Sequence, residues 1–257
     1  MKYETLTLER EGALATVWLD RPERRNALNG TALQEVAEVF EALQGEFDTR
    51  VVVLAGRGLS FCAGADRRDP PGAPRGGAGM RERRHQSQQG LRAVQAIERL
   101  EAITLARVHG HAIGGGLVLA LACDLRVAAA GTVFQIPEVD LGVPLSWGAV
   151  PRLIAEIGAA RARELILLCD RFDAGRAESL GIVQRVVPPD ELDAAVLGWA
   201  QRLAAKPEVA VHMTKTQFQA YASVHPLGDV TAADGDWLRE AARGGVARDS
   251  FRGGSKE

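Results

Sequence analysis

The sequence predicts an α/β domain in which strands are joined by helical crossovers. Short runs of β-branched residues alternate with stretches whose apolar residues recur every three or four positions. Of the 257 residues, 46% are hydrophobic and 25% are charged, which suits one large globular domain with its own core. The expected strands are Leu14–Leu19, Val51–Ala55, Leu105–Val108, Leu125–Ala128 and Ile182–Val187.

Helices are expected between these strands. Thr31–Leu43 and Gln86–Leu100 both show the apolar spacing of an amphipathic helix. His109–Ile113 reads as a turn, and Leu117–Ala122 reads as a helix that is apolar on every side and therefore buried. The chain after Pro207 is expected to form helices as well.

Two segments interrupt this pattern. Arg67–Arg84 is rich in Pro, Gly and Arg, which favours a mobile surface loop. Its basic residues fit either a solvated surface or a contact with a phosphate group, and the sequence leaves both open. Breaks in the last helical region are expected near Pro226–Gly228.

Charge and cysteine content exclude several classes of protein. The 31 basic and 33 acidic residues give a net charge of -2, so we expect neither nucleic acid nor a membrane as a partner. The opening residues lack the apolar core of a signal peptide, which favours a cytoplasmic protein. Cys62, Cys123 and Cys169 are odd in number and scattered, which indicates buried, reduced thiols.

Three glycines precede the apolar helix in the stretch GGGLVLALACD, Gly114–Asp124. The first amides of a helix lack intrahelical partners and favour negative charge, and glycine allows a ligand to approach them closely. Leu117 stands where a phosphate-binding Walker loop needs lysine, so that motif is excluded. The stretch therefore suits either an anion or oxyanion site or simply the close packing of two elements.

A second turn of small residues follows the strand Val51–Ala55. Ala63-Gly64-Ala65-Asp66 again offers backbone amides just past a strand end. An oxyanion hole needs two donors about 3 Å from one oxygen, and two such turns could supply them.

Five segments resemble the crotonase, or enoyl-CoA hydratase/isomerase, family, in order between about residues 3 and 220. They are RPERRNALN (21–29), FCAGAD (61–66), HGHAIGGGLVLALACDLRVAA (109–129), FQIPEVDLGVP (134–144) and AESLGIVQRVVP (177–188). The resemblance implies a crotonase-like spiral of β-β-α turns over residues 1–195 and a C-terminal helical region over residues 196–257. It also implies assembly as a homotrimer or hexamer, for which the helical region is a candidate element.

The resemblance also implies the site. The amides of Ala65 and Gly115 would bind the carbonyl oxygen of a coenzyme A thioester and stabilise an enolate. The thioester is the substrate, and neither a metal nor another cofactor is implied. The substrate groove would be lined by Arg24, Arg25, Ala27, Leu28, Ala63, Asp66, Gly114, Val118 and Trp147, with Arg24 or Arg25 near a phosphate.

The reaction depends on the carboxylates in this site. Hydratases of the family resemble one another in having two glutamates, and here Val118 takes the first position while Glu138 takes the second. Val118 lies three residues after Gly115, on the same helix face. A single buried glutamate, with its pKa raised by burial, resembles the arrangement of isomerases that convert 3-enoyl-CoA to 2-enoyl-CoA.

Several alternatives remain open at this point. Dienoyl-CoA isomerases and aromatic dehalogenases resemble this chain but carry aspartate where it has Ser146, which weakens both. Asp140 could supply a second acid if its segment is extended, and the enzyme would then be a 2-enoyl-CoA hydratase. The chain could also be a non-catalytic acyl-CoA binding protein, with Glu138 a solvated loop acid.

Structural rather than catalytic roles are expected for several other residues near these motifs. His109 and His111 flank the glycine turn and are expected to be hydrogen-bonded structural residues. Asp66 and Asp124 read as turn or cap residues. Trp147 fits a wall of the acyl pocket or an ordinary core residue.

Overall fold

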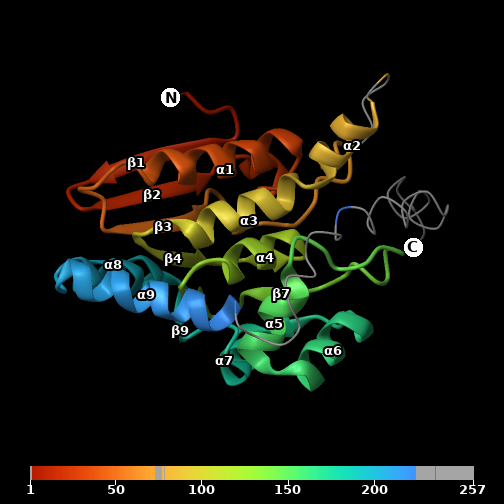
Figure 1. Cartoon of the computed structure of the whole chain (residues 1–257). Helices are drawn as coiled ribbons and strands as arrows, with labels where there is room; N and C mark the ends of the chain where they lie inside the picture. Colours follow the sequence, from red (N-terminus) through yellow and green to blue (C-terminus); the bar gives the residue numbers. More distant parts are fainter. Residues whose placement is uncertain (1, 73–76, 78, 224–234, 236–257) are drawn as a thin grey trace.

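The computed structural model describes residues 2–72, 77, 79–223 and 235. Its larger sheet has the strand order β1-β2-β3-β4-β6-β9 (Figure 1). The strands are β1 (Leu6–Glu11), β2 (Leu14–Leu19), β3 (Val51–Gly56), β4 (Ile103–Val108), β6 (Leu125–Ala129) and β9 (Arg185–Val187). β1 and β2 pair antiparallel, and the other neighbours pair parallel, so the predicted crossover architecture is confirmed.

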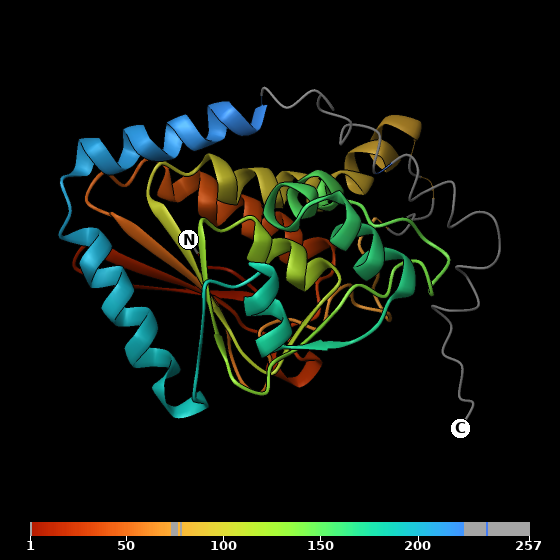
Figure 2. The same cartoon turned by 90° about the horizontal axis from the view of Figure 1, so that it is seen from below.

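Helices cover both faces of this sheet, which explains why β3 is buried along its whole length. Val52 and Leu54 belong to the core cluster that includes α1 (Gly30–Leu43) and α3 (Gln89–Arg99). The alternate residues of β3 pack instead with α8 (Leu192–Ala204), on the opposite face (Figure 2).

A second, three-stranded sheet lies beside the first. It contains β5 (His111–Ile113), β7 (Val133–Gln135) and β8 (Phe172–Asp173) in the order β5-β7-β8. The predicted turn His109–Ile113 is therefore wrong from His111 onward, because a three-residue strand is too short to show a period in the sequence. β5 leads directly into α4 (Gly115–Leu121), the predicted buried helix.

The remaining helices connect and cover these sheets. They are η1 (Pro22–Arg24), α2 (Met80–Ser87), α5 (Ala149–Ile157), α6 (Ala159–Leu168), α7 (Ala174–Leu180), η2 (Pro189–Glu191) and α9 (Glu208–Ser223). The loop predicted for Arg67–Arg84 is wrong from Met80 onward, where a run of Arg, Glu and Gln without Gly or Pro forms α2. Residues 73–76 and 78 of that segment lie outside the described residues.

The C-terminal region is helical, as predicted, through α8 and α9. The expected boundary between residues 195 and 196 falls inside α8, whose Leu192, Val196 and Ala200 pack on the large sheet. That division stays a prediction, and Pro226–Gly228 lies outside the described residues.

The three thiols are buried and free, as predicted. Burial raises the pKa of Cys62 and Cys123 to about 12, so both are protonated at neutral pH. Within the described ranges, no helix has the length and apolar character needed to cross a membrane.

Candidate active site

The first half of the site is the turn after β3, which contains Ala65. Leu28 donates its amide hydrogen to the Gly64 carbonyl at 2.8 Å, and the Asp66 amide donates to the Leu28 carbonyl at 2.8 Å. This parallel bridge uses the groups on either side of Ala65, so the Ala65 amide itself points to the opposite side. Among the described residues, no acceptor bonds to the Ala65 amide.

The second half is the turn between β5 and α4. Gly114 has φ 48° and ψ -120°, and its amide donates to the Gln135 carbonyl of β7 at 2.9 Å. That bond holds the turn so that Gly115 begins α4. A Cβ added to Gly64 would lie 2.8 Å from the Ile113 carbonyl oxygen and 3.9 Å from the Gly115 amide nitrogen, so the two turns are in contact.

Glu138 places a carboxyl group beside these turns. It opens a turn in which the Val143 amide donates to the Glu138 carbonyl at 3.0 Å. A Cβ added to Gly114 would lie only 2.4 Å from Glu138 Oε1. The residue as a whole is half-buried, but its Oε2 is buried and has no hydrogen-bond partner among the described residues. The solvated loop acid is therefore wrong.

Burial has an electrostatic consequence for this group. It removes solvation from the ionised carboxylate and raises the pKa of Glu138 to about 7. A carboxyl group with that pKa can both take up and release a proton near neutral pH.

Two apolar side chains complete the surroundings of Gly115. Val118 lies one helical turn further along α4 and is 3% exposed. Trp147 is 7% exposed, and a Cβ added to Gly115 would lie 2.3 Å from its Cζ3. On its other side the indole faces Gly90 of α3, where an added Cβ would lie 2.1 Å from Cε2.

Sequence reasoning missed Gly90. The signal available was a glycine inside a predicted helix, which costs stability and therefore indicates a close approach by another group.

The loop before α1 borders the Ala65 turn. Ala63 donates its amide hydrogen to the Arg25 carbonyl at 2.9 Å, and Leu28 is buried. Arg25 is exposed, whereas Arg24 and Ala27 are half-buried. The structure thus brings this loop to the turn, while a role for either arginine toward a phosphate stays a prediction.

Asn26 is a further residue that sequence reasoning missed. It has φ 57°, and its side chain accepts from the Arg21 amide and donates to the carbonyls of Arg57 and Ser60. These bonds fix the loop against the end of β3. The available signal was asparagine in a turn, since asparagine tolerates a positive φ.

The two aspartates serve structural contacts. Asp66 accepts from the Arg68 amide at 3.0 Å and from Arg21 Nη2 at 2.9 Å. Burial opposes its ionisation, but these two donors outweigh it and hold the pKa of Asp66 below its usual range. Asp124 lies in a bend, and its Oδ2 bonds to Thr104 of β4 and to Lys215 of α9.

The histidines are hydrogen-bonded, as predicted. His109 Nε2 lies 2.9 Å from the Gly58 carbonyl oxygen, and His111 Nδ1 lies 3.0 Å from Ser60 Oγ. Burial lowers the pKa of both imidazoles. Asp140 is exposed, and its segment is a turn rather than extended, so the condition for a second acid at that position is not met.

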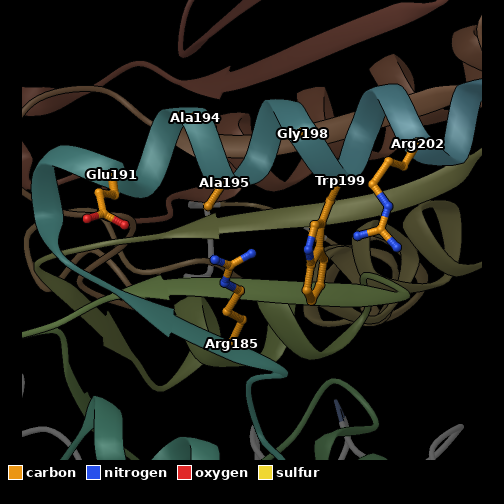
Figure 3. A pocket seen from close by; sticks show the side chains of 7 residues that line it. All are labelled: Arg185, Glu191, Ala194, Ala195, Gly198, Trp199 and Arg202. Carbon is orange, nitrogen blue, oxygen red and sulfur yellow. The ribbon is translucent and has the colours of Figure 1, made fainter.

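A separate hollow of about 380 Å³ lies between α8 and β9. Figure 3 shows that the indole of Trp199 extends from α8 into this hollow. Arg185 projects from β9 toward α8, and Arg202 lies beside the indole. None of the predicted site residues lines it.

Known proteins share this fold and sequence pattern. The profile of the enoyl-CoA hydratase/isomerase family matches residues 9–246. A crotonyl-CoA hydratase of Syntrophomonas wolfei is 35% identical over 216 residues, which cover 84% of this chain and 81% of that protein.

Solved structures agree with this result. An enoyl-CoA hydratase from Mycobacterium avium subsp. paratuberculosis superimposes with a TM-score of 0.88 at 25% identity, covering 98% of this chain and 100% of that one. A monofunctional enoyl-CoA isomerase from M. smegmatis gives a TM-score of 0.70 at 30% identity, covering 87% of this chain and 96% of that one. The chain belongs to the enoyl-CoA hydratase/isomerase family and has the crotonase fold.

Proposed function

We propose that this chain is an isomerase that converts a 3-enoyl-CoA into the conjugated 2-enoyl-CoA. The observation that carries the proposal is Glu138, a buried carboxyl group whose Oε2 has no partner within the described part of the chain. It stands against Gly114, at the start of the helix that presents the Gly115 amide.

The proposed reaction uses the carboxylate as a proton shuttle. The amides of Ala65 and Gly115 would donate to the thioester oxygen and stabilise the negative charge that develops there. Glu138, ionised, takes a proton from C2, and the electrons form a dienolate. The same carboxyl group returns the proton at C4, so that the double bond moves to C2–C3 and the base is regenerated.

The apolar neighbourhood supports proton transfer rather than addition of water. Val118 offers a hydrocarbon wall on the face of α4 that carries Gly115. Glu138 is then the one acid that the described site residues place against the glycine turn.

A second candidate is hydration of a 2-enoyl-CoA, since several relatives are named as hydratases. Hydration would have to proceed with one glutamate and a water held by other groups. A third candidate, acyl-CoA binding without turnover, would need the same oxyanion-binding turns.

We further propose that Arg24 or Arg25 contacts a phosphate group of coenzyme A and that no other cofactor takes part. We also propose that the chain assembles as a homotrimer or hexamer in the cytoplasm.

Replacement of the base tests the proposed role. Glu138→Gln keeps the shape of the side chain but removes the proton acceptor, so turnover of a 3-enoyl-CoA should fall by about 10²–10⁴. Binding of a saturated acyl-CoA, measured by calorimetry, should stay within a few-fold of the parent protein. Asp140→Asn, two residues away and exposed, is the matched control and should keep full turnover. Full turnover in Glu138→Gln would refute the assigned base.

A further inference from the structure

Trp147 is held in an unusual backbone conformation beside the proposed reaction centre. It has φ 59°, a left-handed conformation that a non-glycine residue rarely adopts. Its indole fits between two helices at points where both lack a side chain, Gly90 of α3 and Gly115 of α4.

An ion pair lies beside the backbone of this residue. Arg152 of α5 pairs through Nε and Nη2 with both carboxylate oxygens of Glu98 on α3. Arg152 Nη1 also donates to the carbonyl of Gly148 at 2.6 Å and reaches the carbonyl of Trp147 at 3.5 Å. The same helix α3 therefore accommodates the indole at Gly90 and anchors its backbone through Glu98.

The orientation of the ring is defined by its contacts. A Cβ added to Gly115 would meet Cζ3 and Cη2, which belong to the six-membered ring, at 2.3 and 2.6 Å. A Cβ added to Gly90 would meet Nε1 at 2.3 Å. The hydrocarbon edge of the indole thus faces the Gly115 turn, and its N–H group lies on the side of Gly90.

From this placement, and resting on the proposed function, we propose that Trp147 is a specificity-determining residue that keeps water from the acyl group. A bound water needs two to four polar partners. With the two amides bound to the thioester oxygen, the indole edge at Gly115 and the buried side chain of Val118 offer hydrocarbon rather than hydrogen-bonding groups beside the turn that Glu138 contacts. The enzyme then moves a proton between two carbons instead of adding water across the double bond.

The test compares the products formed by variants of the full-length protein. Each variant receives 3-butenoyl-CoA in one reaction and 2-butenoyl-CoA in another. The rate at which hydrated product forms is divided by the rate at which 3-butenoyl-CoA is isomerised, and this ratio is compared between variants. Trp147→Ala should raise this ratio by about tenfold or more, because water gains access to the site. Trp147→Phe keeps an apolar ring and should leave the ratio within a few-fold of the parent.

Gly90→Ala moves the indole without changing Trp147 itself. The added Cβ would overlap the ring and displace it, so the ratio of hydrated to isomerised product should rise as in Trp147→Ala. This variant keeps the proposal testable if Trp147→Ala does not fold. An unchanged ratio in a folded Trp147→Ala or Gly90→Ala protein would overturn the proposal.

A readout without substrate separates this proposal from the proposed function. If Trp147 keeps the site dry, Trp147→Ala should bring the pKa of Glu138 down from about 7 toward its ordinary value, detected as a shift in the pH range over which Glu138 affects stability. A parent protein that hydrates rather than isomerises would refute the proposed function together with the exclusion of water that rests on it. An unmoved Glu138 pKa in the variant would refute the role of Trp147.

Discussion

At the scale of single residues, Glu138 gives up solvation on folding, and no described residue gives its Oε2 a hydrogen bond in exchange. A group in that position lowers the stability of the fold when it is ionised. Such a cost is typical of functional sites, where the charged form is needed for the reaction.

The first prediction concerns stability against pH. The folded-state pKa of Glu138, about 7, lies above the ordinary value of 4.5, so its contribution to stability is fully present below pH 4.5 and is lost as pH rises through 7. The loss should reach about 3 kcal/mol, since each unit of pKa corresponds to about 1.4 kcal/mol. Urea unfolding of the parent and of Glu138→Gln between pH 4 and 8 measures it. A difference between the two proteins that does not vary with pH would contradict the buried carboxyl.

The second prediction concerns Gly114. Alanine there would place a Cβ 2.4 Å from Glu138 Oε1 at a residue with φ 48°, so the carboxyl group must move. Turnover should fall by about tenfold or more. Gly131→Ala is the control, because Gly131 also has a positive φ, 83°, but an added Cβ there meets nothing within 4 Å. Equal losses of turnover in both variants would mean that backbone strain, rather than contact with Glu138, is responsible.

At the scale of elements, the last described helix is tied to the sheet by one buried cation. Lys215 Nζ of α9 donates to Asp124 Oδ2 at 2.7 Å and to the Ala102 carbonyl at 2.9 Å. The same carboxylate oxygen accepts from the Thr104 amide of β4. The contact joins residues 91 positions apart, which is why the pattern along the chain does not reveal it.

Removal of this cation should loosen α9 from β4. Lys215→Met leaves the Asp124 carboxylate without its charge partner and should lower the free energy of unfolding by about 2–4 kcal/mol. Denaturant unfolding measures the loss, and adding Asp124→Asn should recover part of it. Arg10→Met breaks an exposed pair with Glu46 and should cost less than about 1 kcal/mol. A similarly small cost for Lys215→Met would show that the pair does not hold α9.

Elements differ in how well the sequence predicts them. β2 has the predicted bounds Leu14–Leu19, because its alternating residues lie between clear turn signals. The strand predicted at Ile182–Val187 begins only at Arg185, because Ile182 instead donates its amide hydrogen to the Ala177 carbonyl within α7. β5, β7 and β8 have three residues or fewer and give no periodic signal.

At the scale of the whole molecule, the fold was accessible from the sequence. The resemblance pointed to Glu138 and Gly115 because each lies in a short contiguous motif, and their roles stay predictions. Glu98 and Arg152 could not be found in this way, since their roles arise where α3 and α5 meet beside Trp147. Such contacts depend on how distant elements pack, which local pattern does not encode.

The proposed isomerase is tested most directly by giving the purified protein a 3-enoyl-CoA and, in a second cuvette, a 2-enoyl-CoA. The absorbance of the conjugated thioester is followed in both. If the chain is the proposed isomerase, conjugation appears from the 3-enoyl substrate and little is lost from the 2-enoyl substrate. Rapid loss of conjugation from the 2-enoyl substrate, without its formation from the 3-enoyl one, would contradict the isomerase and establish a hydratase in its place.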